Sequence, residues 1–201
     1  ERFEADTGYH ERTCPYCGDD DISEAHECPI CHTNYTSEDF CQECYDTVNQ
    51  ALTELKEKLL KHGYTFYSQT DTEVAIKLVD YYYKKYKLGP IDAIAKTMVR
   101  IRGSYALELM FRDYPGEIWV ARKDSPMIIG IADGETYVAS DVPAILKYTR
   151  NVYYIGNLEF AKLTPGEAHF YNLDGDEIEK QTTEIKWDAE AAEKAGFEHF
   201  M

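Results

Sequence analysis

The order of apolar and polar residues along the chain predicts helices first and strands afterwards. Residues 53–62 have a helix-forming composition with leucines on one face, and Gly63 ends this predicted helix. A second helix is expected over 70–86, opened by capping residues, and a third over 91–101, after a Gly-Pro break. A short strand is predicted between the first two helices, over 64–68.

Short apolar runs dominate after residue 103 and are typical of β-strands. Asp133-Gly134 and Asp174-Gly175 are tight-turn signals of the kind that joins antiparallel neighbours. The expected strands cover residues 105–111, 118–121, 127–131, 137–139, 152–155, 159–163, 168–171 and 177–180. Helices followed by such a series predict an α+β fold with layered sheets covered by helices.

Composition fits a folded chain with an uneven charge distribution. Of 201 residues, 44% are hydrophobic and 29% charged, and no apolar run approaches the length of a membrane span. Residues 1–52 hold 13 of the 37 acidic residues and two of the 21 basic ones. This excess argues against binding to nucleic acid or to a membrane surface. The first residues show no secretory signal, so we expect a cytoplasmic protein.

All six cysteines lie in three C-x-x-C pairs near the start of the chain. Two residues between thiols place both sulfur atoms on one side of a turn, and two such pairs complete a tetrahedral Zn²⁺ site. The pattern therefore predicts structural zinc as cofactor. The predicted metal ligands are Cys14, Cys17, Cys28, Cys31, Cys41 and Cys44.

The spacing leaves the choice of ligands open. One possible set of four ligands is Cys28, Cys31, Cys41 and Cys44, the last two at a helix start, as in a treble clef. The other is Cys14, Cys17, Cys28 and Cys31, as in a zinc ribbon. A second ion would need His10, His26 or His32 to join the remaining pair. A disulfide framework is the alternative, which the expected compartment disfavours. An all-thiolate site has no open position for catalysis.

Several motifs after residue 55 carry a family resemblance. They are Thr70-Asp71-Thr72-Glu73-Val74, Arg102-Gly103-Ser104-Tyr105-Ala106, residues 121–130, Ala139-Ser140-Asp141, residues 163–167 and Phe197-Glu198-His199-Phe200-Met201. In order and spacing, residues 55–201 closely resemble the glutaminase domain of glutamine–fructose-6-phosphate aminotransferases. The resemblance implies a partial N-terminal-nucleophile αββα sandwich and a chemistry in which glutamine hydrolysis supplies ammonia to a sugar-phosphate isomerase domain.

The resemblance also shows what this sequence lacks. The family uses an N-terminal cysteine as nucleophile, with its own α-amine as base, and an Asn-Gly pair for the oxyanion. Residue 1 is Glu, no Asn-Gly occurs, and the family's first hundred or so residues are replaced by the cysteine-rich segment. Cys14 cannot substitute, because its amide nitrogen is not a free base. We therefore assign no catalytic residue and expect the chain alone to be inactive.

One site residue carries over. Asp71 matches the family carboxylate that holds the α-ammonium group of glutamine, and a helix N-cap is its alternative role. Two functions stay open: part of a glutaminase, or a non-catalytic, zinc-dependent protein-interaction module. The expected partners are glutamine, a missing half or an isomerase domain, and a second copy through self-association, because absent strands would expose sheet edges.

The predicted domains follow from these observations. Residues 1–52 form the zinc-binding module, 53–192 the partial glutaminase domain and 193–201 an exit linker.

Overall fold

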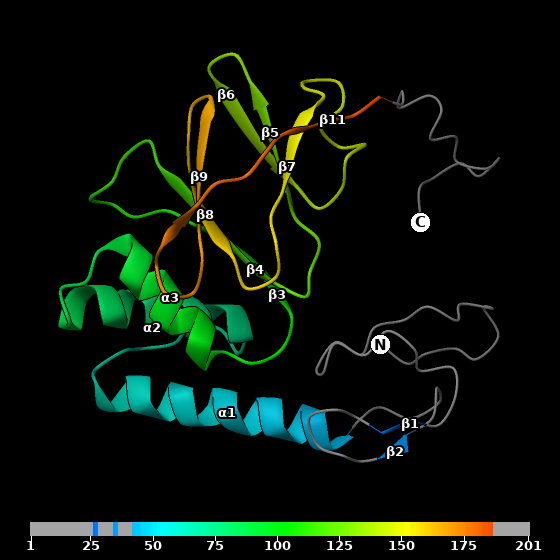
Figure 1. Cartoon of the computed structure of the whole chain (residues 1–201). Helices are drawn as coiled ribbons and strands as arrows, with labels where there is room; N and C mark the ends of the chain where they lie inside the picture. The colour runs from blue at the N-terminus through cyan, green and yellow to red at the C-terminus, as the bar shows by residue number, and fades with distance from the viewer. Residues whose placement is uncertain (1–25, 28–33, 36–41, 187–201) are drawn as a thin grey trace. The chain divides into compact units, whose positions relative to one another are not determined.

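The structure is a computed structural model that describes residues 26–27, 34–35 and 42–186, with side chains from residue 49 onward (Figure 1). The chain divides into two compact units, residues 1–104 and 105–201. The predicted mixed fold is confirmed, since the described residues form three helices and two larger antiparallel sheets. In the part of the chain that is described, no helix has the length and apolar character needed to cross a membrane.

The first unit contains a small two-stranded antiparallel sheet and all three helices. Its elements are β1 (His26–Glu27), β2 (Asn34–Tyr35), α1 (Gln42–Lys61), α2 (Asp71–Lys85) and α3 (Pro90–Arg100). Helix α1 runs unbroken past residue 52, and whether a domain boundary lies there stays a prediction. It ends where predicted, because Gly63 adopts a φ of +85° that favours glycine, and its N–H donates to the Leu60 carbonyl.

Helix α2 packs against both α1 and α3 within this unit. Its buried face repeats at helical spacing and supplies the apolar contacts that hold the three helices together. The buried residues are Val74, Ala75, Leu78, Val79, Tyr81 and Tyr82. Thr70 is the N-cap and Pro90 opens α3, so the predicted helices over 70–86 and 91–101 are confirmed to within one or two residues.

The strand predicted over 64–68 is wrong. The segment is irregular, and its backbone groups are used by α2 instead of by a neighbouring strand. The N–H groups of Tyr67 and Ser68 donate to the Glu73 carboxylate at 2.9 and 2.7 Å. An alternating apolar pattern does not make a strand when its donors are satisfied by a capping side chain.

The second unit contains two antiparallel sheets. Its strands are β3 (Tyr105–Leu109), β4 (Ile118–Lys123), β5 (Ile128–Ala132), β6 (Glu135–Ala139), β7 (Asn151–Tyr154), β8 (Phe160–Thr164), β9 (Glu167–Tyr171), β10 (Glu177–Ile178) and β11 (Thr183–Glu184). One sheet has the order β10-β9-β8-β4-β3 and the other β11-β7-β5-β6. In Figure 1, β5 lies between β6 and β7. The eight predicted strands are therefore all present, and β11 was not predicted.

The two sheets share one apolar core. Side chains from β4, β8 and β9 meet side chains from β5 and from the residues beside β5 and β7. The members are Val120, Met127, Ile129, Ile155, Ala161, Leu163 and Phe170. The register is set by short turns: Ala132 pairs with Glu135 across Asp133-Gly134, which confirms that hairpin.

Candidate functional site

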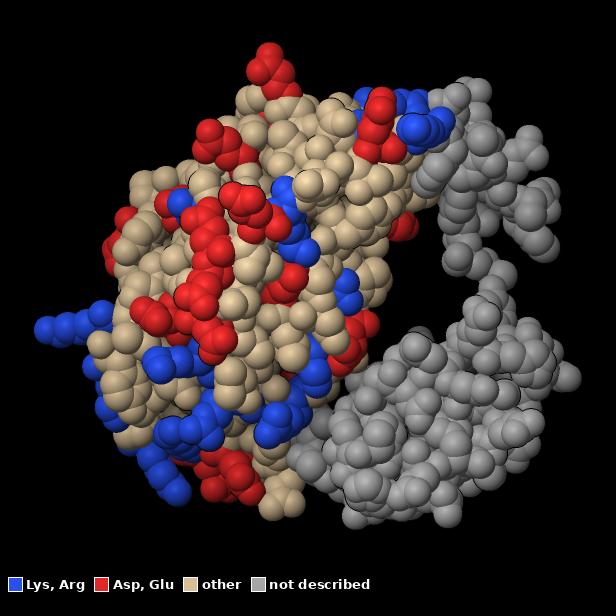
Figure 2. Space-filling model, viewed as in Figure 1, with Lys and Arg blue, Asp and Glu red and all other residues tan. Residues whose placement is uncertain are grey.

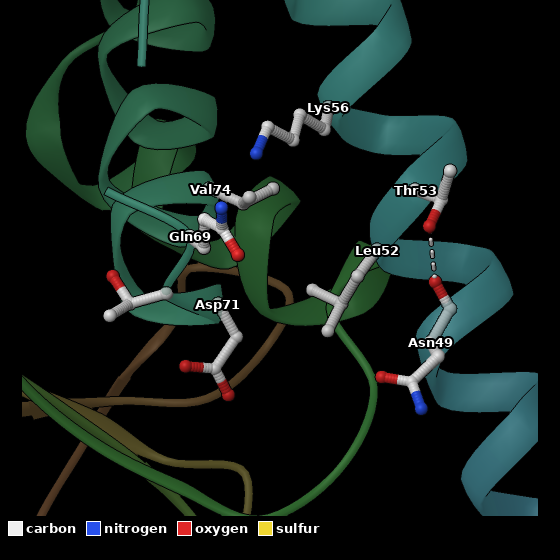
Figure 3. A pocket seen from close by; sticks show the side chains of 8 residues that line it. Asn49, Leu52, Thr53, Lys56, Gln69, Asp71 and Val74 are labelled. Carbon is white, nitrogen blue, oxygen red and sulfur yellow. Dashed lines mark hydrogen bonds between the residues drawn. The ribbon is translucent and has the colours of Figure 1, made fainter. Parts of the chain in front are cut away.

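A pocket of about 560 Å³ lies in the first unit, between α1 and the start of α2 (Figure 3). One wall is a face of α1, and the other is the residues just before α2 together with its first turn. The lining residues are Asn49, Leu52, Thr53, Lys56, Gln69, Thr70, Asp71 and Val74. Figure 3 shows the Lys56 ammonium and the Asp71 carboxylate in different parts of this pocket, with Leu52 directed into the space between the walls.

Asp71, the predicted substrate-binding residue, lies on the pocket wall as the first residue of α2. It is not the N-cap, because Thr70 holds that position and its hydroxyl accepts from the Glu73 N–H at 3.4 Å. The Asp71 Oδ1 atom accepts from the Thr72 N–H at 2.8 Å. The other carboxylate oxygen, Oδ2, accepts no hydrogen bond from the described residues, and the side chain is exposed. Asp71 thus presents one acceptor oxygen to a ligand.

Glu73 fixes the segment that leads into α2. Its carboxylate accepts from the Ser68 hydroxyl at 2.6 Å as well as from the two N–H groups of Tyr67 and Ser68, and it pairs with Lys77 at 3.3 Å. The Ser68 hydroxyl hydrogen bond, followed by the Tyr67 N–H, lowers the pKa of Glu73 from 4.5 to about 2. Glu73 therefore stays ionised at neutral pH and holds Gln69 and Thr70 in place as pocket wall.

The described lining residues of the pocket include one cation, Lys56, and one carboxylate, Asp71. The Lys56 ammonium lies 5.1 Å from the centre of the Phe66 ring, and the Lys77 ammonium lies 5.5 Å from the same ring. On the face of the molecule shown in Figure 2, acidic and basic side chains are interspersed around larger neutral areas. A pocket with both signs of charge suits a small zwitterion better than a polyanion.

The lining chemistry favours binding rather than bond cleavage. The Asp71 carboxylate can accept from an ammonium group, and the amides of Asn49 and Gln69 can donate and accept. The Thr53 hydroxyl is used within α1, where it donates to the Asn49 carbonyl at 2.8 Å. No cysteine, serine or histidine is among the lining residues, so the described part of the pocket offers no nucleophile paired with a base.

The predicted metal ligands lie elsewhere. Cys14, Cys17, Cys28, Cys31 and Cys41 are outside the described residues, and Cys44 is described only as backbone in the first turn of α1. Among the residues whose side chains are described, no three His, Cys, Asp or Glu side chains are grouped to hold a metal ion. The zinc site and its ligands therefore stay a prediction.

The sequence singled out Asp71, which lies on the pocket wall and whose role as a substrate-binding residue stays a prediction, but it gave no hint of the α1 side of the pocket. Asn49, Leu52, Thr53 and Lys56 occupy positions i, i+3, i+4 and i+7 of α1, a spacing that places them on one helix face. The sequence alone therefore indicates that these residues share a helix face. It does not indicate the opposite wall of the pocket, because only the fold brings this face beside the start of α2.

Comparisons with known proteins point to one family. A family model described as a glutamine amidotransferase domain matches residues 44–147. The chain is 48% identical over 147 residues to a glutamine–fructose-6-phosphate aminotransferase (isomerizing) of Caldanaerobacter subterraneus subsp. tengcongensis, and 47% identical over 148 residues to that of Clostridium acetobutylicum. A third, from Methanosarcina acetivorans, is 43% identical over 153 residues. These matches cover 73–74% of this chain and 24–25% of each relative, so the chain spans about a quarter of their length.

Proposed function

We propose a glutamine-binding function, from the premise that this chain belongs to the glutamine amidotransferase domain family. The pocket between α1 and α2 is the glutamine site, and Asp71 is the residue that accepts the α-ammonium group. The single observation that carries this proposal is the Asp71 carboxylate, exposed on the pocket wall with one oxygen that accepts no hydrogen bond from the described residues.

The size and chemistry of the pocket support a free amino acid. About 560 Å³ is within the roughly 300–1,000 Å³ range of small-molecule sites. The α-ammonium would pair with Asp71 through charge-assisted hydrogen bonds, which are stronger than neutral ones. The amide side chains of Asn49 and Gln69 offer both a donor and an acceptor to the carboxamide of glutamine.

The chain is part of an enzyme that takes ammonia from glutamine and transfers it to a sugar phosphate. The support is the relatives' name, glutamine–fructose-6-phosphate aminotransferase, together with 40–48% identity across several organisms. We further propose the partial αββα sandwich of N-terminal-nucleophile hydrolases as its fold. The three helices described in the first unit, and the two antiparallel sheets of the second unit that share an apolar core, support that assignment.

The chain by itself is expected to bind glutamine without hydrolysing it. The described lining of the pocket contains no thiol, and the six cysteines are better used as metal ligands because they occur in three C-x-x-C pairs. Ammonia release by purified protein, followed with a coupled glutamate dehydrogenase assay, tests this expectation. Turnover above that of the buffer would contradict it.

The binding test compares two exposed aspartates, each in the first turn of a helix. Asp71→Ala should weaken glutamine binding about 10- to 100-fold in calorimetry, because a hydrogen bond to a charged group contributes about 1.5–3 kcal/mol. Asp92→Ala is the matched control, since Asp92 is also an exposed acidic residue in the first turn of a helix and does not line the pocket. Equal glutamine affinity in all three proteins would refute the proposed site.

A second candidate function is a zinc-dependent protein-interaction module, which the three C-x-x-C pairs favour. Zinc content of the purified protein and glutamine binding separate the two candidates. Stoichiometric zinc with no glutamine binding would favour the interaction module, whereas glutamine binding that is lost in Asp71→Ala favours the glutaminase function.

A further inference from the structure

The four sheet ends of the second unit differ in how well they are protected. Strands β10 and β11 are only two residues long, and short edge strands are poor templates for pairing. Strand β6 is longer, but its Thr136 hydroxyl donates to the Thr164 carbonyl at 2.6 Å and accepts from the Gly166 N–H, so the β8–β9 turn packs on it. Strand β3 is a five-residue edge with β4 on one side.

The side chains of β3 divide into a covered face and an open face. Leu107 and Leu109 are buried, whereas Ala106 and Glu108 are exposed on the face that β3 shares with Val120. Just beyond the strand, Met110 is 81% exposed. Among the described residues, β3 has a paired strand on one side only, two exposed side chains on one face and an exposed methionine beyond its end, and such an edge is a surface for strand pairing.

We propose that β3 is the self-association strand of this protein, and that two copies pair antiparallel through it about a two-fold axis at Leu107. In this register Ala106 lies opposite Glu108 of the second copy, and Tyr105 lies opposite its Leu109. The two five-stranded sheets then join into one sheet of ten strands. The face that carries Ala106 and Glu108 lies on the same side of this sheet in both copies.

Charge and size complementarity select the second copy as the occupant and fix the register. Ala106 pairs with Arg122 on β4, and Arg122 forms no ion pair among the described residues. Its Nη1 donates to the Ile155 carbonyl at 2.9 Å, and its Nε is buried without an acceptor among those residues. Glu108 of the second copy would stand two strand spacings, about 10 Å, from Arg122, with only the small Ala106 between them. Long Arg and Glu side chains can meet across that distance.

The same residues disfavour the neighbouring registers. A two-fold axis at Glu108 would place two carboxylates directly opposite each other, which is destabilising in antiparallel pairs. A shift by one residue in one copy alone would place Leu107 and Leu109 on the opposite face from their counterparts. Only the axis at Leu107 gives two Glu–Arg pairs, one on each side of the axis.

The experiment uses the full chain and reverses one charge. Glu108→Lys places a lysine beside Arg122 of the second copy at both symmetry-related sites, so the dimer dissociation constant should rise about tenfold or more. Glu167→Lys is the matched control, because Glu167 is an exposed strand residue of the same unit and gives the same change in charge. Sedimentation equilibrium measures the dissociation constants, and circular dichroism confirms that each variant is folded.

Hydrogen exchange gives a second, independent measurement on the unaltered protein. Backbone amides of residues 105–109 should exchange more slowly at about 100 μM protein than at about 1 μM, because pairing satisfies the outward N–H groups. The proposal is supported by concentration-dependent dimers that Glu108→Lys weakens and Glu167→Lys does not. It is overturned by a protein that is monomeric at both concentrations, by a dimer insensitive to Glu108→Lys, or by β3 amides whose exchange does not slow on dimerisation.

Discussion

Gly130 lies in the middle of β5, and two side chains pack closely on its Cα. Replacing Gly130 with alanine therefore tests how tightly the four-stranded sheet is packed. A Cβ atom at this position would lie 2.7 Å from Ile145 Cδ1 and 2.7 Å from Thr149 Cγ2. Thr149 is held in place, because its hydroxyl donates to the Ile131 carbonyl at 2.6 Å. Movement of Ile145 can therefore relieve only the first contact, and relief of the second needs movement of the backbone.

The magnitude follows from two opposing effects. Overpacking a core costs about 1–3 kcal/mol, while replacing glycine by alanine at an ordinary φ stabilises by about 0.4–1 kcal/mol through the unfolded chain. Gly130→Ala should therefore destabilise the second unit by about 1–2 kcal/mol. Ile145→Val removes the Cδ1 atom and should cost about 0.5–1.5 kcal/mol alone. Together they should cost about 1 kcal/mol less than the sum, because the valine removes one of the two close contacts of the new Cβ.

Urea unfolding of the four proteins measures these differences, read as shifts of the midpoint at constant slope. Gly89→Ala is the control: a Cβ at Gly89 meets nothing within 4 Å, so its effect should stay within about 1 kcal/mol. Strictly additive effects of Gly130→Ala and Ile145→Val, or a Gly130→Ala protein as stable as the original, would refute the reasoning.

Two further predictions concern the pocket wall and the sheet core. Hydrogen bonds lower the pKa of Glu73 from 4.5 to about 2, so ionised Glu73 stabilises the fold above about pH 4.5 and this stabilisation is lost as the pH falls toward 2. Urea unfolding at successive pH values measures this loss of stability in acid, and Glu73→Gln should abolish the part that Glu73 causes. Phe160 is fully buried, and its ring centre lies 5.3 Å from that of Tyr171. Phe160→Ala should therefore lower the free energy of unfolding by about 3–5 kcal/mol in urea unfolding, and a loss below about 1 kcal/mol would contradict this reasoning.

The elements that could be predicted from the sequence are those whose signals are local. Thr70 and Pro90 mark helix starts through their own backbone chemistry, and Gly63 marks a helix end through its positive φ. Asp133-Gly134 marks a hairpin for the same kind of reason. Each of these residues acts within a few positions of itself, so the chain need not be folded for the effect to be foreseen.

The features that could not be predicted depend on contacts between distant segments or on competition for donors. The 64–68 segment has a strand-like composition, but Glu73 takes the N–H groups that a strand would have offered to a neighbour. The pocket needs a face of α1 and the start of α2, which only packing brings together. The short β11 pairs with β7 across some thirty residues, and no local pattern marks it.

The unbroken course of α1 from Gln42 to Lys61 limits how this protein can be shortened. A truncated chain that started at Asn49 would turn Asn49 and Leu52 into the first turn of a helix, where backbone N–H groups have no partners within the helix and the end frays. The residues that form one wall of the pocket would then unwind first. The backbone of the two helical turns ahead of Asn49 therefore supports the pocket wall.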